Sequence, residues 1–281
     1  MRGQFLFVLR ISTTVAWRAV REISDCRSAG RFLCLVGGTR ACYRVATMLV
    51  MGIETSTMQG GVALLSEQGL LSEYLLNIKA THTERLLPSI DRVLRDAGKT
   101  LSQVEGIAVA TGPGSFTGLR IALSTAKGLA VAANKPLIGV STLEAMAWTL
   151  PFCVHQICPI LDARKGEIYC ALFRHEGDRL IRLMDEAALS PDLLVGRIQE
   201  RTVFLGDGLP VYGDLLKGRL GELALFPPFS QRGGRPAAVA ELGRRRLLQG
   251  QHDEILELVP RYLRTFEAEL RRLGTHTRSA S

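Results

Sequence analysis

The sequence lacks the residue patterns on which most metal-dependent and nucleophilic enzymes rely. Its five histidines, at positions 82, 155, 175, 252 and 276, form neither an H-x-x-x-H nor an H-E-x-x-H motif. There is no G-x-S-x-G elbow for a catalytic serine, and no Gly-Lys-Ser/Thr follows the glycine-rich loop at 112–118 as it would in a Walker loop. We therefore assign no catalytic residue and no metal ligand from the sequence.

Cysteine pairs and long apolar runs are also missing. The six cysteines include no C-x-x-C pair, and in a chain of 281 residues they do not resemble a disulfide framework. This predicts a reducing, cytoplasmic environment. No apolar run approaches the roughly 20 residues that a membrane-spanning helix needs, so we expect no membrane association.

The net charge of +8 is concentrated at the start of the chain. Residues 1–47 contain eight arginines and two acidic residues, which leaves 27 basic and 25 acidic residues in the remainder. Met48 then opens a strand-like apolar run. We expect translation to start there, with a disordered or processed extension as the alternative for residues 1–47. The nearly neutral remainder argues against a tRNA-binding module that acts alone.

The first half of the remaining chain predicts a strand meander followed by alternating helices and strands. Period-two and apolar runs predict strands at 49–54, 61–66 and 70–77, and then at 106–110 and 137–140. Helical spacing predicts helices at 81–97 and 119–133, the first opened by a capping box of Thr81 and Glu84. Strands that alternate with helices favour a partly parallel sheet covered on both faces.

The second half repeats this opening. A strand predicted at 157–161 runs into Asp162, as the strand at 49–54 ends on Glu54, and each is followed by a hairpin and helices. We therefore predict an α/β protein of two ribonuclease-H-like lobes facing each other. The expected lobes are residues 48–150 and 151–265, followed by a flexible tail at 266–281.

Two carboxylates at strand ends are candidates for a phosphate and magnesium site. Glu54 is followed by the hydroxyls of Thr55 and Ser56, and Asp162 holds the same place in the second half. Such a turn can hold hydrated Mg²⁺ and contact phosphate oxygens, or it can satisfy its own backbone. Glu54 is longer than the usual Asp, so we expect ATP or ADP binding to be weak or absent.

A glycine-rich loop at 112–118 stands between a predicted strand and a predicted helix. Its backbone N–H groups could bind an anion at the helix N-terminus. The other interpretation is a structural turn in which Pro113 fixes the bend and Ser115 or Thr117 caps the helix. Generic physical chemistry favours the structural turn.

These segments together resemble one family, the TsaB family, also called YeaZ. The resemblance covers roughly residues 48–265 in collinear order and includes the segments at 53–57, 81–88, 139–143, 162–169 and 260–264. Its most specific part is the loop formed by Gly112, Pro113, Gly114, Ser115, Phe116, Thr117 and Gly118.

The resemblance implies the duplicated fold of the actin-like ATPase superfamily and a role without catalysis of its own. Such a protein pairs with a catalytic paralogue, TsaD, and with the ATPase TsaE. The complex transfers a threonylcarbamoyl group to the adenosine beside the tRNA anticodon, so this chain would meet tRNA only through the complex. The paralogue's histidine metal motif is absent here, since only His82 lies in the corresponding region.

The resemblance also implies that helices of the first lobe form a homodimer and overlap the surface offered to the paralogue. Carried onto this sequence, these are the predicted helices 81–97 and 119–133. The side chains that we expect at this interface are Leu86, Leu87, Ile90, Leu94, Leu119, Arg120, Leu123 and Lys127.

Two other functions stay open at this point. The chain could be an active actin-like ATPase or carbamoyl-group transferase that uses Glu54 and Asp162. It could also be a tRNA-binding module acting alone, which would need a basic face on the folded body. The run Arg244-Arg245-Arg246 and the basic tail could contact RNA within a complex. We interpret that arginine run as a solvated helix face.

Overall fold

The computed structural model describes residues 31–36, 39–44, 48–77 and 82–263. Residues 1–47 and 48–281 form separate compact units. In the first unit, strand β1 (Arg31–Val36) pairs antiparallel with β2 (Thr39–Arg44), a hairpin that the sequence analysis did not predict.

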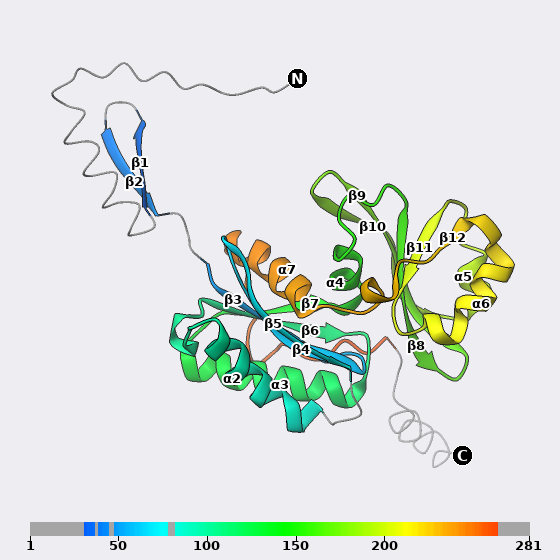
Figure 1. The fold of residues 1–281 in the computed structure, drawn as a ribbon, viewed down its shortest axis with the longest axis horizontal. Coiled ribbons are helices and arrows are strands. Elements are labelled where there is room, and N and C mark those ends of the chain that lie inside the picture. Colours follow the sequence, from blue (N-terminus) through cyan, green and yellow to red (C-terminus); the bar gives the residue numbers. More distant parts are fainter. Residues whose placement is uncertain (1–30, 37–38, 45–47, 78–81, 264–281) are drawn as a thin grey trace, which may run out of the picture. The chain divides into compact units, whose positions relative to one another are not determined.

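The first lobe is built on a five-stranded mixed sheet with the order β5-β4-β3-β6-β7 (Figure 1). The central strand β3 pairs antiparallel with β4 and parallel with β6, because a short turn joins β3 to β4 while β6 returns through a helix. The strands are β3 (Val50–Glu54), β4 (Gln59–Ser66), β5 (Gly69–Asn77), β6 (Gly106–Gly112) and β7 (Leu137–Ser141).

The second lobe repeats this topology. Its sheet has the order β10-β9-β8-β11-β12, so in both sheets the first strand in sequence lies in the middle and the second runs antiparallel to it. The strands are β8 (Gln156–Arg164), β9 (Glu167–Glu176), β10 (Arg179–Leu189), β11 (Thr202–Leu205) and β12 (Ala224–Leu225). This repetition confirms the predicted α/β fold of two lobes that share one topology.

Helices cover both faces of the first sheet. Helices α2 (His82–Asp96) and α3 (Phe116–Ala133) lie side by side on one face. Helix α7 (Pro236–Leu248) covers the other face. Helix α4 (Thr142–Trp148) lies between the lobes, because its apolar residues enter the cores of both. The second lobe carries α5 (Pro191–Val195) and α6 (Leu209–Leu220).

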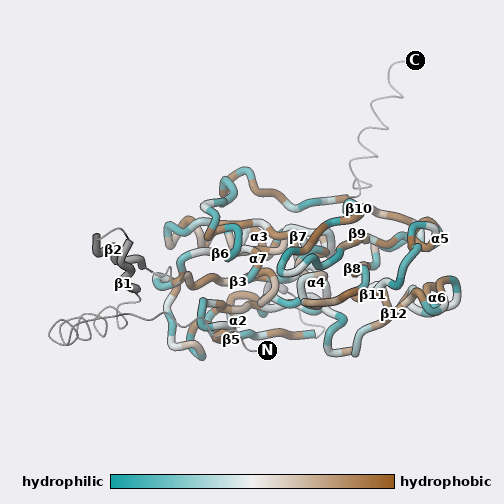
Figure 2. Tube along the Cα trace, turned by 90° about the horizontal axis from the view of Figure 1, so that it is seen from above, coloured by the Kyte–Doolittle hydropathy of each residue, from teal (hydrophilic) through white to brown (hydrophobic). Residues whose placement is uncertain are grey.

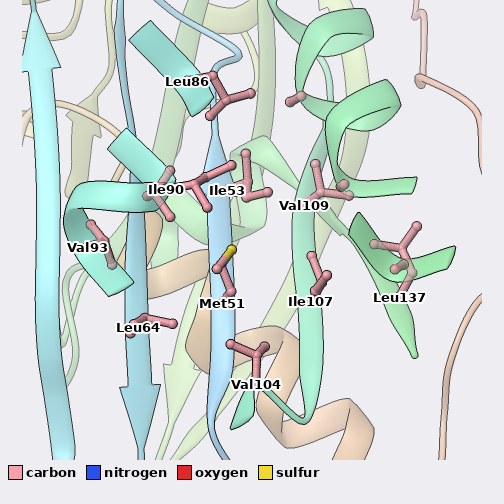
Figure 3. Packing of buried hydrophobic residues seen from close by; sticks show 14 of the residues in the cluster. Met51, Ile53, Leu64, Leu86, Ile90, Val93, Val104, Ile107, Val109 and Leu137 are labelled. Carbon is pink, nitrogen blue, oxygen red and sulfur yellow. The ribbon is translucent and has the colours of Figure 1, made fainter. Parts of the chain in front are cut away.

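The core of the first lobe forms between the sheet and α2. Met51 and Ile53 of β3 meet Leu86, Ile90 and Val93 of α2, all of them buried (Figure 3). Burying one such side chain contributes about 1.5–3 kcal/mol. In Figure 2 the hydrophobic stretches run through the inner strands and the hydrophilic ones lie mainly in the loops. No helix of the described residues is long and apolar enough to cross a membrane.

Helix α7 packs on the first sheet, although the sequence analysis placed residues 151–265 in one lobe. The contact is close because glycine and alanine face each other across it. A Cβ atom on Gly243 would lie 2.3 Å from the Ala108 Cβ, and one on Gly52 would lie 2.3 Å from the Pro236 carbonyl oxygen. The chain therefore returns to the first lobe after the second sheet is complete.

This close packing predicts opposite effects for two helical glycines. Gly243→Ala is expected to lower the free energy of unfolding by about 1–3 kcal/mol, because the added methyl group overpacks the helix against Ala108. A Cβ atom on Gly128 of α3 would have no other atom within 4 Å. Gly128→Ala is therefore expected to raise the free energy of unfolding by about 0.5–1 kcal/mol. Urea unfolding of the full chain measures both, and a stable Gly243→Ala variant would contradict the packing.

Candidate functional site

A cleft with a volume of about 250 Å³ opens between the two lobes. The first lobe contributes Met58 and Gln59, and the second contributes Asp207, while Phe229 and Arg232 come from the segment that returns to α7. The cleft lies outside the carboxyl ends of the parallel strands, where open α/β sheets usually bind ligands.

Glu54 is the last residue of β3, and its side chain is only 1% exposed. Its Oε1 accepts the backbone N–H of Ser56 at 2.5 Å, while Oε2 has no hydrogen-bond partner among the described residues. Burial raises the pKa of this carboxyl to about 7. The nearby Ser56 lowers that pKa and the Asp207 carboxylate raises it, both to a smaller extent. Glu54 is therefore partly protonated at neutral pH.

Asp207 follows β11 and carries the second perturbed carboxyl group of the site. Its Oδ1 accepts the backbone N–H of Asp162 at 3.3 Å. Although Asp207 as a whole residue is exposed, its carboxyl group is partly desolvated against the protein. This desolvation, together with the nearby Asp162 carboxylate, raises the pKa of Asp207 to about 6, against the lowering effect of that N–H. The sequence analysis missed Asp207 as a site residue, and the only available signal was the Gly206-Asp207-Gly208 turn after a predicted strand.

Asp162 holds the start of the β8–β9 hairpin together. Its Oδ1 accepts the backbone N–H of Arg164 at 2.9 Å and the hydroxyl of Tyr212 at 3.3 Å. Its Oδ2 lies 3.4 Å from the Arg164 guanidinium. Asp207 thus bonds to the backbone of Asp162, and its charge also raises the pKa of Glu54.

The glycine-rich loop at 112–118 packs directly on the turn that follows Glu54. The Ser115 N–H donates to the Ser56 carbonyl at 2.6 Å, and the Thr55 hydroxyl donates to the Gly118 carbonyl at 2.8 Å. Gly114 has a φ of +154°, and a Cβ atom there would lie 2.4 Å from the Ser56 oxygen. Only glycine permits this approach.

The same loop starts helix α3. Ser115 is the N-cap, and its hydroxyl oxygen accepts the Gly118 N–H at 3.3 Å. Of the two capping residues that the sequence offered, the structure uses Ser115, while Thr117 is exposed in the first turn. Gly112 and Pro113 are buried beneath the loop.

These contacts decide how well the site fits a magnesium-bound nucleotide. A phosphate loop needs free hydroxyl and N–H groups, but the Thr55 hydroxyl and the N–H groups of Ser56 and Ser115 already have partners within the fold. The Ser56 hydroxyl and Glu54 Oε2 are buried and have no hydrogen-bond partner among the described residues. Because three of the groups that could bind phosphate are already used within the fold, these residues fit the phosphate end of a nucleotide poorly.

The predicted interface side chains divide into two groups. Leu86, Ile90, Leu119 and Leu123 are at most 5% exposed and pack in the first lobe's own core or around it, so their assignment to a partner surface is corrected. Leu87, which is 59% exposed, points away from the core, and Leu94 is partly buried against it.

The two predicted interface cations of α3 are accessible but already engaged. Arg120 donates from Nε to the Tyr262 hydroxyl at 3.0 Å, and Lys127 donates from Nζ to the Leu256 carbonyl at 3.1 Å. Both partners come from the segment that follows α7. The outer surface of α3 is therefore shared with the C-terminal part of the described chain.

Comparison with known proteins identifies the family of this chain. The family model described as TsaD, tRNA N6-adenosine threonylcarbamoyltransferase, matches residues 69–269. The "tRNA threonylcarbamoyladenosine biosynthesis protein TsaB" of Bacillus subtilis (strain 168) is 33% identical over 225 residues, which cover 79% of this chain and 96% of that protein. The Haemophilus influenzae protein of the same name is 32% identical over 231 residues, covering 77% and 94%. The chain belongs to the TsaB family.

A solved structure supports the same assignment. YeaZ from Pseudomonas aeruginosa superposes with a TM-score of 0.65 at 27% sequence identity, covering 77% of this chain and all of that one. The fold of this TsaB-family chain is therefore shared with YeaZ over the whole YeaZ structure.

In this TsaB-family chain the arginine run of α7 is structural rather than a solvated face. The Arg245 guanidinium lies 4.3 Å from the centre of the Trp148 ring and donates to the Asp178 carbonyl at 3.1 Å. Arg246 donates to the Gly139 carbonyl at 2.6 Å. The described residues also include no cluster of three or more His, Cys, Asp or Glu side chains arranged to hold a metal.

The raised pKa of Glu54 predicts a pH-dependent difference between the wild type and Glu54→Gln. Between pH 4.5 and 7 the unfolded carboxyl loses its proton while the folded one retains it, so the wild type loses stability as pH rises through this window. Relative to Glu54→Gln, this loss is expected to reach roughly 3 kcal/mol. Urea unfolding at pH 4.5 and pH 8 measures it, and a difference that is independent of pH would contradict the raised pKa.

Proposed function

We propose that this chain is a non-catalytic scaffold and dimerisation subunit of the complex that transfers a threonylcarbamoyl group to the adenosine beside the tRNA anticodon. The names of the full-length relatives support the pathway. The observation that carries the scaffold role is the packing of the 112–118 loop on the Glu54 turn, because it uses the polar groups that a phosphate site would need.

The proposed partner is a catalytic paralogue of the TsaD type, with TsaE as the ATPase of the complex and tRNA reached only through it. In isolation the chain would pair with a second copy through the same surface. This surface is the outer side of α2 and α3, where Leu87 and Val131 are exposed. The protein would work in the cytoplasm.

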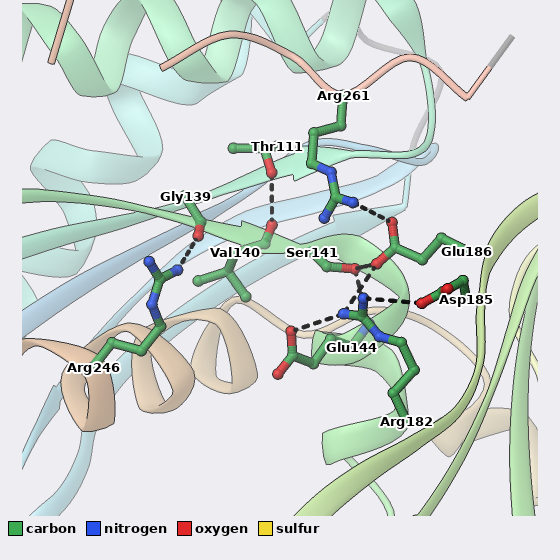
Figure 4. Close-up of polar contacts among 10 residues, drawn as sticks. All are labelled: Thr111, Gly139, Val140, Ser141, Glu144, Arg182, Asp185, Glu186, Arg246 and Arg261. Atoms are coloured by element: carbon green, nitrogen blue, oxygen red, sulfur yellow. Dashed lines mark hydrogen bonds and ion pairs between the residues drawn. The ribbon is translucent and has the colours of Figure 1, made fainter. Parts of the chain in front are cut away.

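A scaffold should hold its lobes in one arrangement, and a buried polar network joins them (Figure 4). Glu186 of β10 accepts a hydrogen bond from the hydroxyl of Ser141 at the end of β7. The Nη2 atom of Arg182 on β10 lies 3.6 Å from Oε1 of Glu186 and 3.8 Å from Oε2 of Glu144 on α4. Arg182 and Glu186 both belong to β10, so the contacts that join the lobes are those to Ser141 and Glu144. They favour one interlobe geometry, because separating the lobes would remove the Ser141 hydroxyl from the buried Glu186 carboxylate.

An independent ATPase or carbamoyl-group transferase is the second candidate. It is favoured by two buried groups near the interlobe cleft, Glu54 Oε2 and the Ser56 hydroxyl, which have no hydrogen-bond partner among the described residues. Calorimetric titration of the isolated chain with ATP and Mg²⁺ separates the two functions. We expect no saturable binding, and tight binding that is lost in Glu54→Gln would support the enzyme instead.

The proposed partner surface predicts a large effect of Leu87→Asp. This substitution places a charge on the outer side of α2, and we expect it to weaken binding to the paralogue from the same organism at least about tenfold. Because Leu87 is exposed, the free energy of unfolding should hardly change. Calorimetric titration gives the affinity and urea unfolding the stability.

Leu193→Asp is the matched control. Leu193 is 60% exposed, close to the 59% of Leu87, and lies on α5 of the second lobe. It should leave the affinity unchanged. Equal affinities for the wild type and Leu87→Asp would show that the interface does not include this part of α2.

A further inference from the structure

Residues 251–263, here named the C-terminal strap, run from the end of α7 across the first lobe. Asp253 pairs with β7, the edge strand of the sheet: its N–H donates to the Leu137 carbonyl at 2.9 Å, and its Oδ2 accepts the Gly139 N–H at 2.7 Å. Further along, the Leu256 carbonyl accepts the hydrogen bond from Lys127 of α3. The strap thus connects the edge of the sheet with the outer side of α3.

The strap then reaches the second lobe through Arg261. The Arg261 N–H donates to the Thr111 carbonyl at 2.7 Å, which fixes the backbone beside the 112–118 loop. Its guanidinium extends to Glu186 of β10, with 3.5 Å between Nη2 and Oε2 (Figure 4). The Glu186 side chain is 1% exposed, and its carboxylate lies between the guanidinium groups of Arg182 and Arg261.

The next residue of the strap holds the first turn of α3. The Tyr262 ring lies 5.1 Å from the Phe116 ring, centre to centre. Arg120 stacks on Phe116 with its guanidinium carbon 3.6 Å from the ring centre and donates to the Tyr262 hydroxyl. Such aromatic and cation–π contacts contribute roughly 0.5–1.5 kcal/mol each. Two adjacent strap residues therefore contact the second lobe and α3.

We propose that Glu186 and Arg261 are positioning residues that set the geometry of the first turn of α3 from the second lobe, through the C-terminal strap. Loss of the ion pair frees Arg261, which loosens Tyr262 and releases Arg120 from its stacked position. The strap is thus a mechanical link between the second lobe and the α2–α3 surface. Its effect on partner binding rests on the proposed function, whereas the link itself does not.

Hydrogen exchange of the strap tests the link without any partner. In Glu186→Gln, the exchange of the Arg261 amide and of the first turn of α3 should accelerate about tenfold over wild type. Arg261→Gln breaks the same ion pair at its exposed partner and should accelerate amide exchange in the first turn of α3 to the same extent. This second variant keeps the test valid if Glu186→Gln folds poorly. Unchanged exchange in both variants would overturn the proposal.

Asp192→Asn is the control for loss of an ordinary ion pair. Asp192 pairs with Arg219 at 2.8 Å on the surface of the second lobe, and both side chains are exposed. In this variant the amide of Arg261 and the amides of the first turn of α3 should exchange at the same rate as in the wild type. Acceleration as large as in Glu186→Gln would show general loosening of the second lobe and would also overturn the specific link.

A binding cycle then shows whether the link reaches the partner surface. Glu186→Gln should weaken binding to the TsaD-type paralogue about fivefold in the wild-type background and have little further effect with Arg120→Ala, because both substitutions loosen the same turn. Additive effects would mean that Glu186 acts by another route. If the wild type does not bind the paralogue, the proposed function fails, and the exchange experiment still decides the link.

Discussion

The backbone of Gly114 lies so close to the Ser56 carbonyl that no side chain fits between them, and much of the first lobe's organisation depends on this approach. It lets the Ser115 N–H and the Thr55 hydroxyl bond across to the opposite segment. The strand that ends on Glu54 is thereby joined to the start of α3. A loop that resembles a phosphate cradle in its glycine content serves instead as a joint between two elements of the same lobe.

That joint has consequences for the cleft and for the outer surface of the lobe. On the cleft side it leaves Glu54 buried, with a raised pKa and one oxygen unsatisfied, an arrangement that costs stability as the pH approaches neutrality. On the outer side it fixes the N-terminus of α3, where Tyr262 of the C-terminal strap accepts a hydrogen bond from Arg120.

Strand and helix positions could be predicted from the sequence because their apolar periods are clear. The meander ending on Glu54 and its repeat ending near Asp162 were enough to predict the duplicated fold. The destination of α7 could not be predicted, since an apolar stripe shows that a helix packs but not on which sheet. Only the small residues at Gly52, Ala108 and Gly243 explain why the first sheet receives it.

The candidate site was predictable in part for the same reason. Glu54 and the 112–118 loop stand out as motifs, but Asp207 is recognisable only when β11 is placed beside β8. Adjacent leucines also looked equivalent, and only the structure separates Leu86 in the core from Leu87 outside it. Arg120 and Lys127 looked like surface cations, yet they hold a strap that lies more than a hundred residues away in sequence.

The most direct test of the scaffold role is the molar mass by light scattering after size exclusion. The full chain is measured alone and then mixed with the TsaD-type paralogue from the same organism. The proposed function predicts a homodimer alone and a complex with one copy of each chain in the mixture. A chain that stays monomeric and elutes unchanged beside the paralogue would contradict it.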